Sequence, residues 1–143
     1  MRAKACLLAL LLVTAASAGC AEYKYYDISV QFNTGPMQFN PTDVSRVQNC
    51  VVTVSGADSF EFSFESDQNC PPQPTGSTTS GGTFEYSSTA DSGTMTFTYR
   101  AYVGSVFPEC LVGEGSTSVP VGLTTAMGML TVNRVSDITS CNR

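Results

Sequence analysis

The sequence lacks histidine and tryptophan entirely. Without histidine, the chain cannot form a Ser-His-Asp or Cys-His nucleophile, the usual zinc catalytic site or a side-chain proton shuttle at neutral pH. Without tryptophan, a stacking platform for sugars is disfavoured. The sequence also lacks a phosphate-binding glycine motif, a CxxC pair and an EF-hand pattern. These absences predict a protein that is not an enzyme and that holds no cofactor.

Charge is also scarce, and most of it is negative. Charged residues make up 13% of the chain, with 12 Asp and Glu against 7 Lys and Arg. Nucleic acids and anionic lipid surfaces attract clustered basic side chains, which this composition does not supply. We therefore expect no nucleic-acid partner. The length of 143 residues suits a single domain with a modest core.

The one strongly apolar run lies at the N-terminus. Arg2 and Lys4 precede the apolar stretch 6–13, and small residues occupy 14–19. This order of a positive, an apolar and a small-residue region predicts a secretory signal peptide over residues 1–19. The apolar stretch is far shorter than the roughly 20 residues that a membrane-spanning helix needs. We therefore expect the segment to be removed and not to remain as a span.

The last residues of this segment resemble a known processing site. Ser17-Ala18-Gly19-Cys20 is similar to the lipobox of bacterial lipoproteins, which usually reads Leu, then Ala or Ser, then Gly or Ala, then Cys; Ser17 stands in the place of Leu. The resemblance implies cleavage before Cys20 and a lipid on its sulfur, which would tether the protein to a membrane. Ala16-Ser17-Ala18 also fits ordinary signal peptidase, which would release a soluble secreted chain beginning at Gly19.

The number of cysteines bears on this choice. Cys6 leaves with the signal peptide, so five of the six cysteines are exported. An odd thiol in an oxidising compartment needs an explanation. If Cys20 carries lipid, the others can form two disulfides, and we predict the pairs Cys50–Cys70 and Cys110–Cys141 because each pair brackets neighbouring strands. The alternative is a secreted dimer that is linked through an intermolecular Cys20 disulfide.

The lipoprotein resemblance also implies a location and partners. Residue 21 is alanine and not the aspartate that resembles an inner-membrane retention signal in enteric-type bacteria, so we expect a cell-envelope protein of the outer membrane. Residues 20–25 are predicted to be a tether, and an extended tether of this length reaches roughly 17 Å. The expected partners are the membrane, through the lipid on Cys20, and an envelope protein or polymer. The alternative location is secretion.

Alternation of apolar and polar residues with period two dominates residues 26–143. It is clearest in three stretches, namely 26–32, 60–64 and 95–103. Weaker strand candidates are 50–54, 83–87, 109–112, 118–121 and 127–132, with turn signals at 56–58, 91–93 and 113–115. About eight short strands predict one all-β domain, a sandwich of two antiparallel sheets of the immunoglobulin-like or jelly-roll-like kind. One helical turn is expected at 42–47, capped by Thr42 or Asp43.

Carboxylates and tyrosines supply the remaining candidate sites. Glu61 and Glu65 share the outward face of one predicted strand, and Glu85 would join them if its strand lies alongside. Three carboxylates could bind Ca²⁺, and two could act as the acid pair of a glycosidase. The simpler interpretation is a solvated face whose charges discourage edge pairing.

Tyrosines gather at the start of the domain. Tyr26 belongs to an apolar stripe and is expected in the core, whereas Tyr23 and Tyr25 fall outside that stripe. The latter two are either ordinary edge residues or an interfacial patch beside the lipid, where rings with polar tips are favoured.

Overall fold

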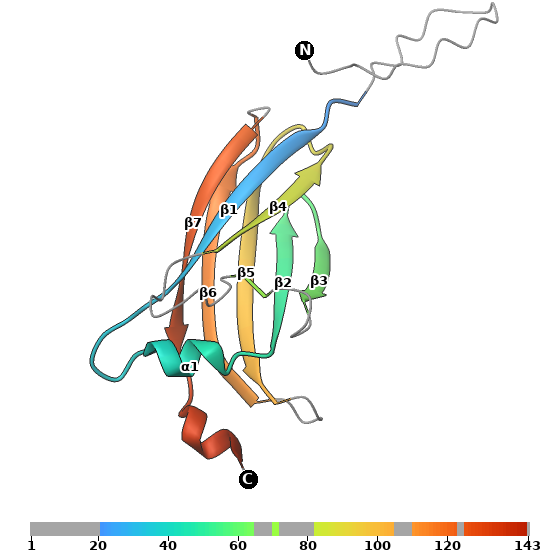
Figure 1. Cartoon of the computed structure of the whole chain (residues 1–143). Coiled ribbons are helices and arrows are strands. Elements are labelled where there is room, and N and C mark those ends of the chain that lie inside the picture. The colour runs from blue at the N-terminus through green and yellow to red at the C-terminus, as the bar shows by residue number, and fades with distance from the viewer. Residues whose placement is uncertain (1–20, 65–69, 72–81, 105–109, 123–124, 143) are drawn as a thin grey trace, which may run out of the picture.

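The structure is a computed structural model that describes residues 21–64, 70–71, 82–104, 110–122 and 125–142. Strands dominate this part of the chain (Figure 1). The strands are β1 (Lys24–Phe32), β2 (Asn49–Gly56), β3 (Phe60–Phe64), β4 (Gly82–Ser88), β5 (Thr94–Val103), β6 (Cys110–Pro120) and β7 (Thr125–Arg134), and the helices are α1 (Pro41–Ser45) and the 3-10 helix η1 (Ile138–Asn142).

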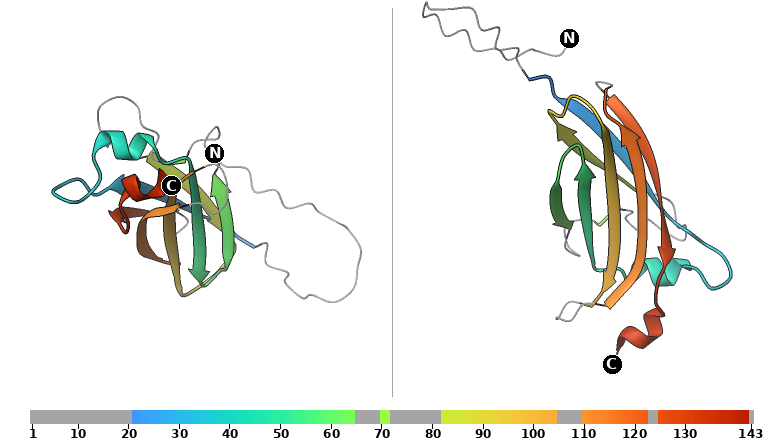
Figure 2. Two further views of the ribbon diagram at one scale, coloured as in Figure 1. Left: turned by 90° about the horizontal axis from the view of Figure 1, so that it is seen from below. Right: turned by 180° about the vertical axis from the view of Figure 1, so that it is seen from behind.

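The strands form one curled sheet in the order β3-β2-β5-β6-β7-β1-β4. Neighbouring strands are antiparallel except β1 and β7, the first and last, which run parallel from Tyr25↔Thr125 to Phe32↔Val132. Figures 1 and 2 show that the curl brings β1 and β4 across one face of β2 and β5. The prediction of an all-β fold is confirmed. The finer prediction of two antiparallel sheets is not confirmed, because the parallel β1–β7 pair joins all seven strands into one mixed sheet.

The core lies inside the curl, where the predicted apolar stripes meet. In β1 and β5 every second side chain is buried, from Tyr26 to Phe32 and from Met95 to Val103. The stripe on β3 behaves differently: Phe62 and Phe64 are half-buried, but Phe60 is 56% exposed because it lies on an edge strand. The buried apolar residues of the described part form one cluster. Alternation therefore locates the core well, except at the edge of the sheet.

The two edges of the sheet meet through aromatic side chains. Phe62 of β3 lies 5.8 Å from Phe84 and 6.3 Å from Tyr86 of β4, measured between ring centroids, and stacks on Tyr86 with an interplanar angle of 6°. Paired rings at such separations add about 0.5–1.5 kcal/mol to the burial of their surfaces. The curl is thus held by packing between the strands at its two ends.

Two short helices lie at the end of the sheet opposite the start of β1 (Figure 1). Asn40 caps α1: its side chain accepts from Asp43 N at 2.9 Å, and its own N–H donates to the Asp43 carboxylate at 3.3 Å. The predicted cap at Thr42 or Asp43 is therefore wrong, because Pro41 already occupies the first turn, a position that its fixed φ favours. Val44 of α1 and Ile138 of η1 are buried, which joins both helices to the core.

Strand β6 runs without interruption through the predicted turn at 113–115. These glycines serve close packing instead. A Cβ on Gly113 would lie 2.7 Å from Phe39 Cζ and 2.8 Å from Val132 Cγ1, and one on Gly115 would collide with the backbone oxygen of Thr131. The turn prediction failed because glycine marks both turns and places where backbones approach closely.

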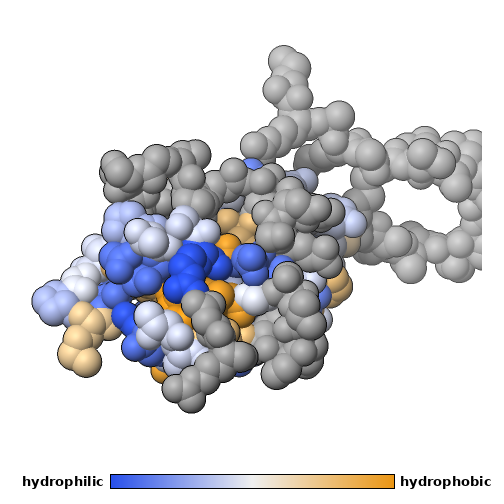
Figure 3. Space-filling view, turned by 60° about the horizontal axis from the view of Figure 1, so that its bottom comes forward, coloured by the Kyte–Doolittle hydropathy of each residue, from blue (hydrophilic) through white to orange (hydrophobic). Residues whose placement is uncertain are grey.

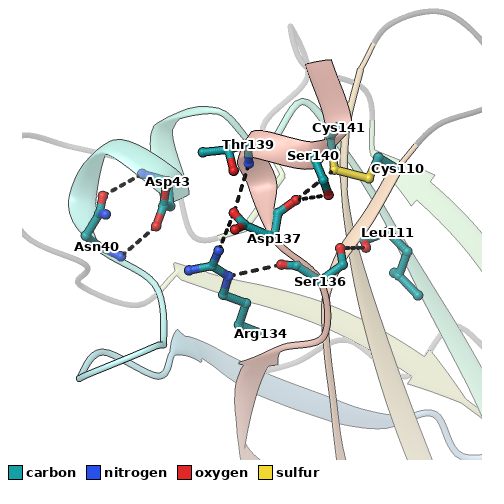
Figure 4. A network of polar contacts seen from close by, with 10 residues as sticks. All are labelled: Asn40, Asp43, Cys110, Leu111, Arg134, Ser136, Asp137, Thr139, Ser140 and Cys141. Carbon is teal, nitrogen blue, oxygen red and sulfur yellow. Dashed lines mark hydrogen bonds and ion pairs between the residues drawn. A yellow bond between two sulfur atoms is a disulfide. The ribbon is translucent and has the colours of Figure 1, made fainter. Parts of the chain in front are cut away.

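The two predicted disulfides are present. Cys50 pairs with Cys70 and Cys110 pairs with Cys141, each with Cα atoms 5.7 Å apart. The first bridge is buried against the core, where Cys50 is fully covered. The second joins the start of β6 to η1 (Figure 4). The four cysteines of the described residues are thus all used.

A polar network ties the C-terminal segment to the sheet (Figure 4). Arg134 Nη2 contacts the Asp137 carboxylate at 2.6 Å, and Arg134 Nε donates to the Ser136 carbonyl at 3.0 Å. The backbone N–H of Thr139 donates to the same carboxylate and is the main reason why the pKa of Asp137 lies below its usual value. The Ser136 hydroxyl donates to the Leu111 carbonyl on β6. These bonds fix the chain after β7 beside β6.

Candidate functional site

The outward face of β5 and β6 is rich in hydroxyl groups. Thr94, Thr96 and Thr98 alternate with the buried residues of β5. Thr96 lies opposite Ser118 on β6, with their hydroxyl oxygens 2.9 Å apart, and Thr98 lies opposite Ser116. This face therefore presents hydrogen-bonding groups at the regular spacing of a sheet.

A recess of about 640 Å³ lies on this face and extends onto β7. Its lining is polar except for the Met129 side chain and Gly115. We call it the outer-face recess, and the residues that line it are Thr98, Arg100, Glu114, Gly115, Ser116, Met129, Thr131 and Asn133. Such a lining suits a ligand that makes many hydrogen bonds.

An ion pair forms part of the lining. Arg100 on β5 lies opposite Glu114 on β6, and its Nε donates to the Glu114 carboxylate at 2.7 Å. That hydrogen bond is the main cause of the raised pKa of Arg100. The two side chains are 39% and 42% exposed. A guanidinium has five N–H donors, so this bond leaves donors that can serve a ligand.

The end of the recess is fixed by an amide pair. Asn33 Nδ2, just beyond β1, donates to Asn133 Oδ1 on β7 at 2.9 Å. Asn133 also lies opposite Glu114 in the pairing of β6 with β7. The recess thus combines side chains from three strands, and Asn33, just beyond β1, holds the Asn133 side chain in place. Sequence analysis missed it because the predicted turn at 113–115 removed Glu114 from any strand.

The structure describes two of the three carboxylates of the predicted acidic site, Glu61 and Glu85. Glu61 lies exposed on β3 and accepts from Thr53 Oγ1 at 3.3 Å. Glu85 lies on β4, which pairs with β1 and not with β3. Glu65 lies outside the described residues. Among the residues that are described, no group of three His, Cys, Asp or Glu side chains could hold a metal ion. The Ca²⁺ site and the acid-only enzyme stay untested predictions.

A carboxylate in the predicted turn at 56–58 joins the two edges of the sheet. Asp58, between β2 and β3, accepts from the Tyr86 hydroxyl at 2.8 Å and from the Ser88 hydroxyl at 2.9 Å, both on β4. The backbone N–H of Ser59 donates to it at 2.8 Å. The bonds from Tyr86 and Ser88 lower the pKa of Asp58, while burial, aided by Asp58, raises the pKa of Tyr86 to about 12. We call this cluster the Asp58 latch.

The tyrosines near the start of the domain divide as expected between core and surface. Tyr26 is 1% exposed, which confirms its place in the core, whereas Tyr23 is 58% and Tyr25 is 45% exposed. Burial raises the pKa of Tyr26. Strand β1 begins at Lys24, so it starts inside the predicted tether. The Lys24 side chain is largely buried and contacts the Asp91 carboxylate at 3.2 Å.

Comparisons with known proteins add no family to this picture: no family model, no curated protein and no solved structure matches the chain. In the part of the chain that the structure describes, no helix is long and apolar enough to cross a membrane. Cys20, the predicted lipidation site, lies outside that part.

Proposed function

We propose that this protein is a lipid-anchored binding module of the bacterial cell envelope, tethered through Cys20, and that it binds an envelope polymer or protein through the outer-face recess. The proposal of a lipid anchor is supported by the pairing of the cysteines. Cys50, Cys70, Cys110 and Cys141 bond with one another, so Cys20 has no partner among the cysteines of the folded domain. A lipid on its sulfur accounts for this odd thiol.

The same odd thiol supports a second candidate. A secreted chain could form a dimer through Cys20, as the signal peptidase site Ala16-Ser17-Ala18 would allow. Under either candidate the outer-face recess is the binding surface. Its Arg100–Glu114 pair and surrounding hydroxyls supply donors and acceptors for a hydroxyl-rich polymer or a polar protein surface.

Replacing Cys20 with serine is expected to move the protein from the membrane fraction to the soluble fraction. Serine has no thiol to form the thioether, so the anchor is lost. Intact mass spectrometry should find the wild-type protein beginning at Cys20 with added acyl mass. Cys6→Ser, inside the signal peptide, is the control and should change neither result. A mature chain that begins at an unmodified Gly19 would contradict lipidation, and a mass that halves on reduction would establish the dimer.

A double substitution of Arg100 and Glu114 by alanine is expected to weaken polymer binding at least about tenfold, which corresponds to roughly 1.4 kcal/mol. Removing both partners leaves no unpaired charge, and an exposed pair contributes only about 0–1 kcal/mol to stability, so the fold should persist. Sedimentation with peptidoglycan sacculi, and separately with lipopolysaccharide, measures the binding. The control is Thr96→Ala with Ser118→Ala, a bonded pair on the same strands outside the recess lining. Equal losses in both variants would rule out the recess.

A further inference from the structure

Exposed apolar side chains gather at one end of the sheet. Tyr23, Tyr25 and Met127 are 58%, 45% and 78% exposed. The parallel pairing of β1 with β7 brings them together, because Tyr25 lies opposite Thr125 and Asp27 lies opposite Met127. Odd-numbered residues of β1 point away from the core, and so does Met127 on β7. We call these three residues the N-terminal apolar patch.

This patch lies at the end of the domain where the chain enters from Cys20. Strand β1 begins at Lys24, and the four steps from Cys20 to Lys24 span at most about 14 Å when extended. Parallel strands begin at the same end of a sheet, so the start of β7 lies there as well (Figure 1). A lipid on Cys20 would therefore enter the bilayer close to the patch.

The opposite end of the domain has a different surface. It carries α1 and η1, and Figure 3, which turns this end forward, shows mainly hydrophilic residues around a smaller hydrophobic area. Met37, in the segment between β1 and α1, is 90% exposed. Val135, just after β7, is 53% exposed. Both are exposed apolar residues far along the sheet from the start of β1, and they supply matched controls for the patch.

Charge decides which kind of membrane surface fits. Glu22 is exposed beside Tyr23, and Asp27 is the next outward residue of β1 after Tyr25. The basic residue near the start of β1 is Lys24, whose side chain is buried and forms an ion pair with Asp91. An acidic surface is repelled by anionic headgroups. Tyrosine rings favour the interface between headgroups and acyl chains, and methionine adapts to irregular apolar surroundings.

We propose that the N-terminal apolar patch rests in the interface of a zwitterionic lipid bilayer when Cys20 carries its lipid. The lipid on Cys20 and the patch, whose first residue Tyr23 follows three positions later, then form two attachments to the membrane. Together they fix the orientation of the domain. This inference rests on the proposed lipid anchor and adds the membrane contact of the folded domain.

Oxidation of methionine tests the contact. The lipidated protein is placed in phosphatidylcholine vesicles and treated with periodate, a charged oxidant that stays in water, and sulfoxide at Met127 and Met37 is followed by peptide mass spectrometry. Oxidation of Met127 should slow at least about fivefold relative to the soluble Cys20→Ser chain, whereas Met37 should react at the same rate in both. Vesicles that contain about half anionic lipid should reduce the protection of Met127 at least about twofold.

Variants separate the patch from the anchor. Tyr23→Ser should restore Met127 oxidation toward the rate in solution, whereas Val135→Ser should leave its protection intact; neither residue lies within a strand. Unprotected Met127 on a protein whose Cys20 carries lipid and which floats with the vesicles would overturn the patch and leave the proposed function standing. A chain without lipid on Cys20 would overturn both.

Discussion

Gly115→Ala is expected to lower the free energy of unfolding by about 3 kcal/mol or more. The added Cβ would collide with the backbone oxygen of Thr131 and lie 3.1 Å from Leu130 Cδ2. The Thr131 oxygen belongs to the backbone and cannot move aside unless β7 shifts relative to β6. The loss of stability should therefore be at least the usual cost of overpacking a core. Urea denaturation of the purified domain, with the midpoint and slope compared between variants, measures the change.

Substitutions at two other glycines provide comparisons for Gly115→Ala. A Cβ on Gly35 would meet nothing within 4 Å, so Gly35→Ala should change stability by less than about 0.5 kcal/mol. At Gly128 the nearest atoms are Val119 Cγ2 at 2.9 Å and Ile28 Cδ1 at 3.0 Å, which are side-chain and not backbone atoms. Gly128→Ala should therefore fall between the two, at about 1–2 kcal/mol. If Gly115→Ala proved as stable as Gly35→Ala, the close approach of β6 and β7 would be refuted.

Asp58→Asn is expected to lower stability by about 2 kcal/mol at neutral pH, because a neutral amide replaces an ionised acceptor of three hydrogen bonds. The folded protein holds the pKa of Asp58 below its usual value of 3.8. The stabilisation is therefore complete above about pH 4 and is lost as the pH falls through the lower folded pKa. Unfolding curves from about pH 7 to pH 2 should show the wild type and the variant converging at the acid end.

Asp91→Asn supplies the control for the Asp58 latch. Asp91 forms an ion pair with Lys24, but its own side chain is 92% exposed. The Lys24 side chain is only 10% exposed, but asparagine keeps an oxygen that can accept from its ammonium group, so this variant should lose no more than about 1 kcal/mol at neutral pH. If Asp58→Asn lost no more stability than Asp91→Asn, or if its difference from the wild type persisted at acid pH, the latch would not hold the sheet edges together.

Local pattern predicted the strands and the disulfides well, for a simple reason. A period of two in 26–32 and 95–103 depends only on which side chains a pleated strand buries, and both stretches are strands with the expected buried face. The pairs Cys50–Cys70 and Cys110–Cys141 each close a short section of chain, so sequence distance was informative. Such features are set by neighbours along the chain.

Local sequence pattern did not predict the features that depend on contacts between distant parts of the chain. Nothing in residues 25–32 indicates that they pair with residues 125–132, and this pairing is what makes one curled sheet instead of two. The Asp58–Tyr86 bond joins residues 28 positions apart, and the pattern around Asp58 indicates a turn but not its partner on β4. The Arg100–Glu114 pair could have been found by reading β6 as one strand, since Arg100 follows the outward threonines of β5.

The parallel pairing of β1 with β7 also bears on how the chain folds. β1 is the first strand of the chain, yet its two neighbours in the sheet are β4 and β7. One edge of β1 therefore stays unpaired until the last strand has joined the sheet. Contacts between such remote segments form slowly, because a long loop must close first. The sheet is thus completed only when the two ends of the domain's sequence come together.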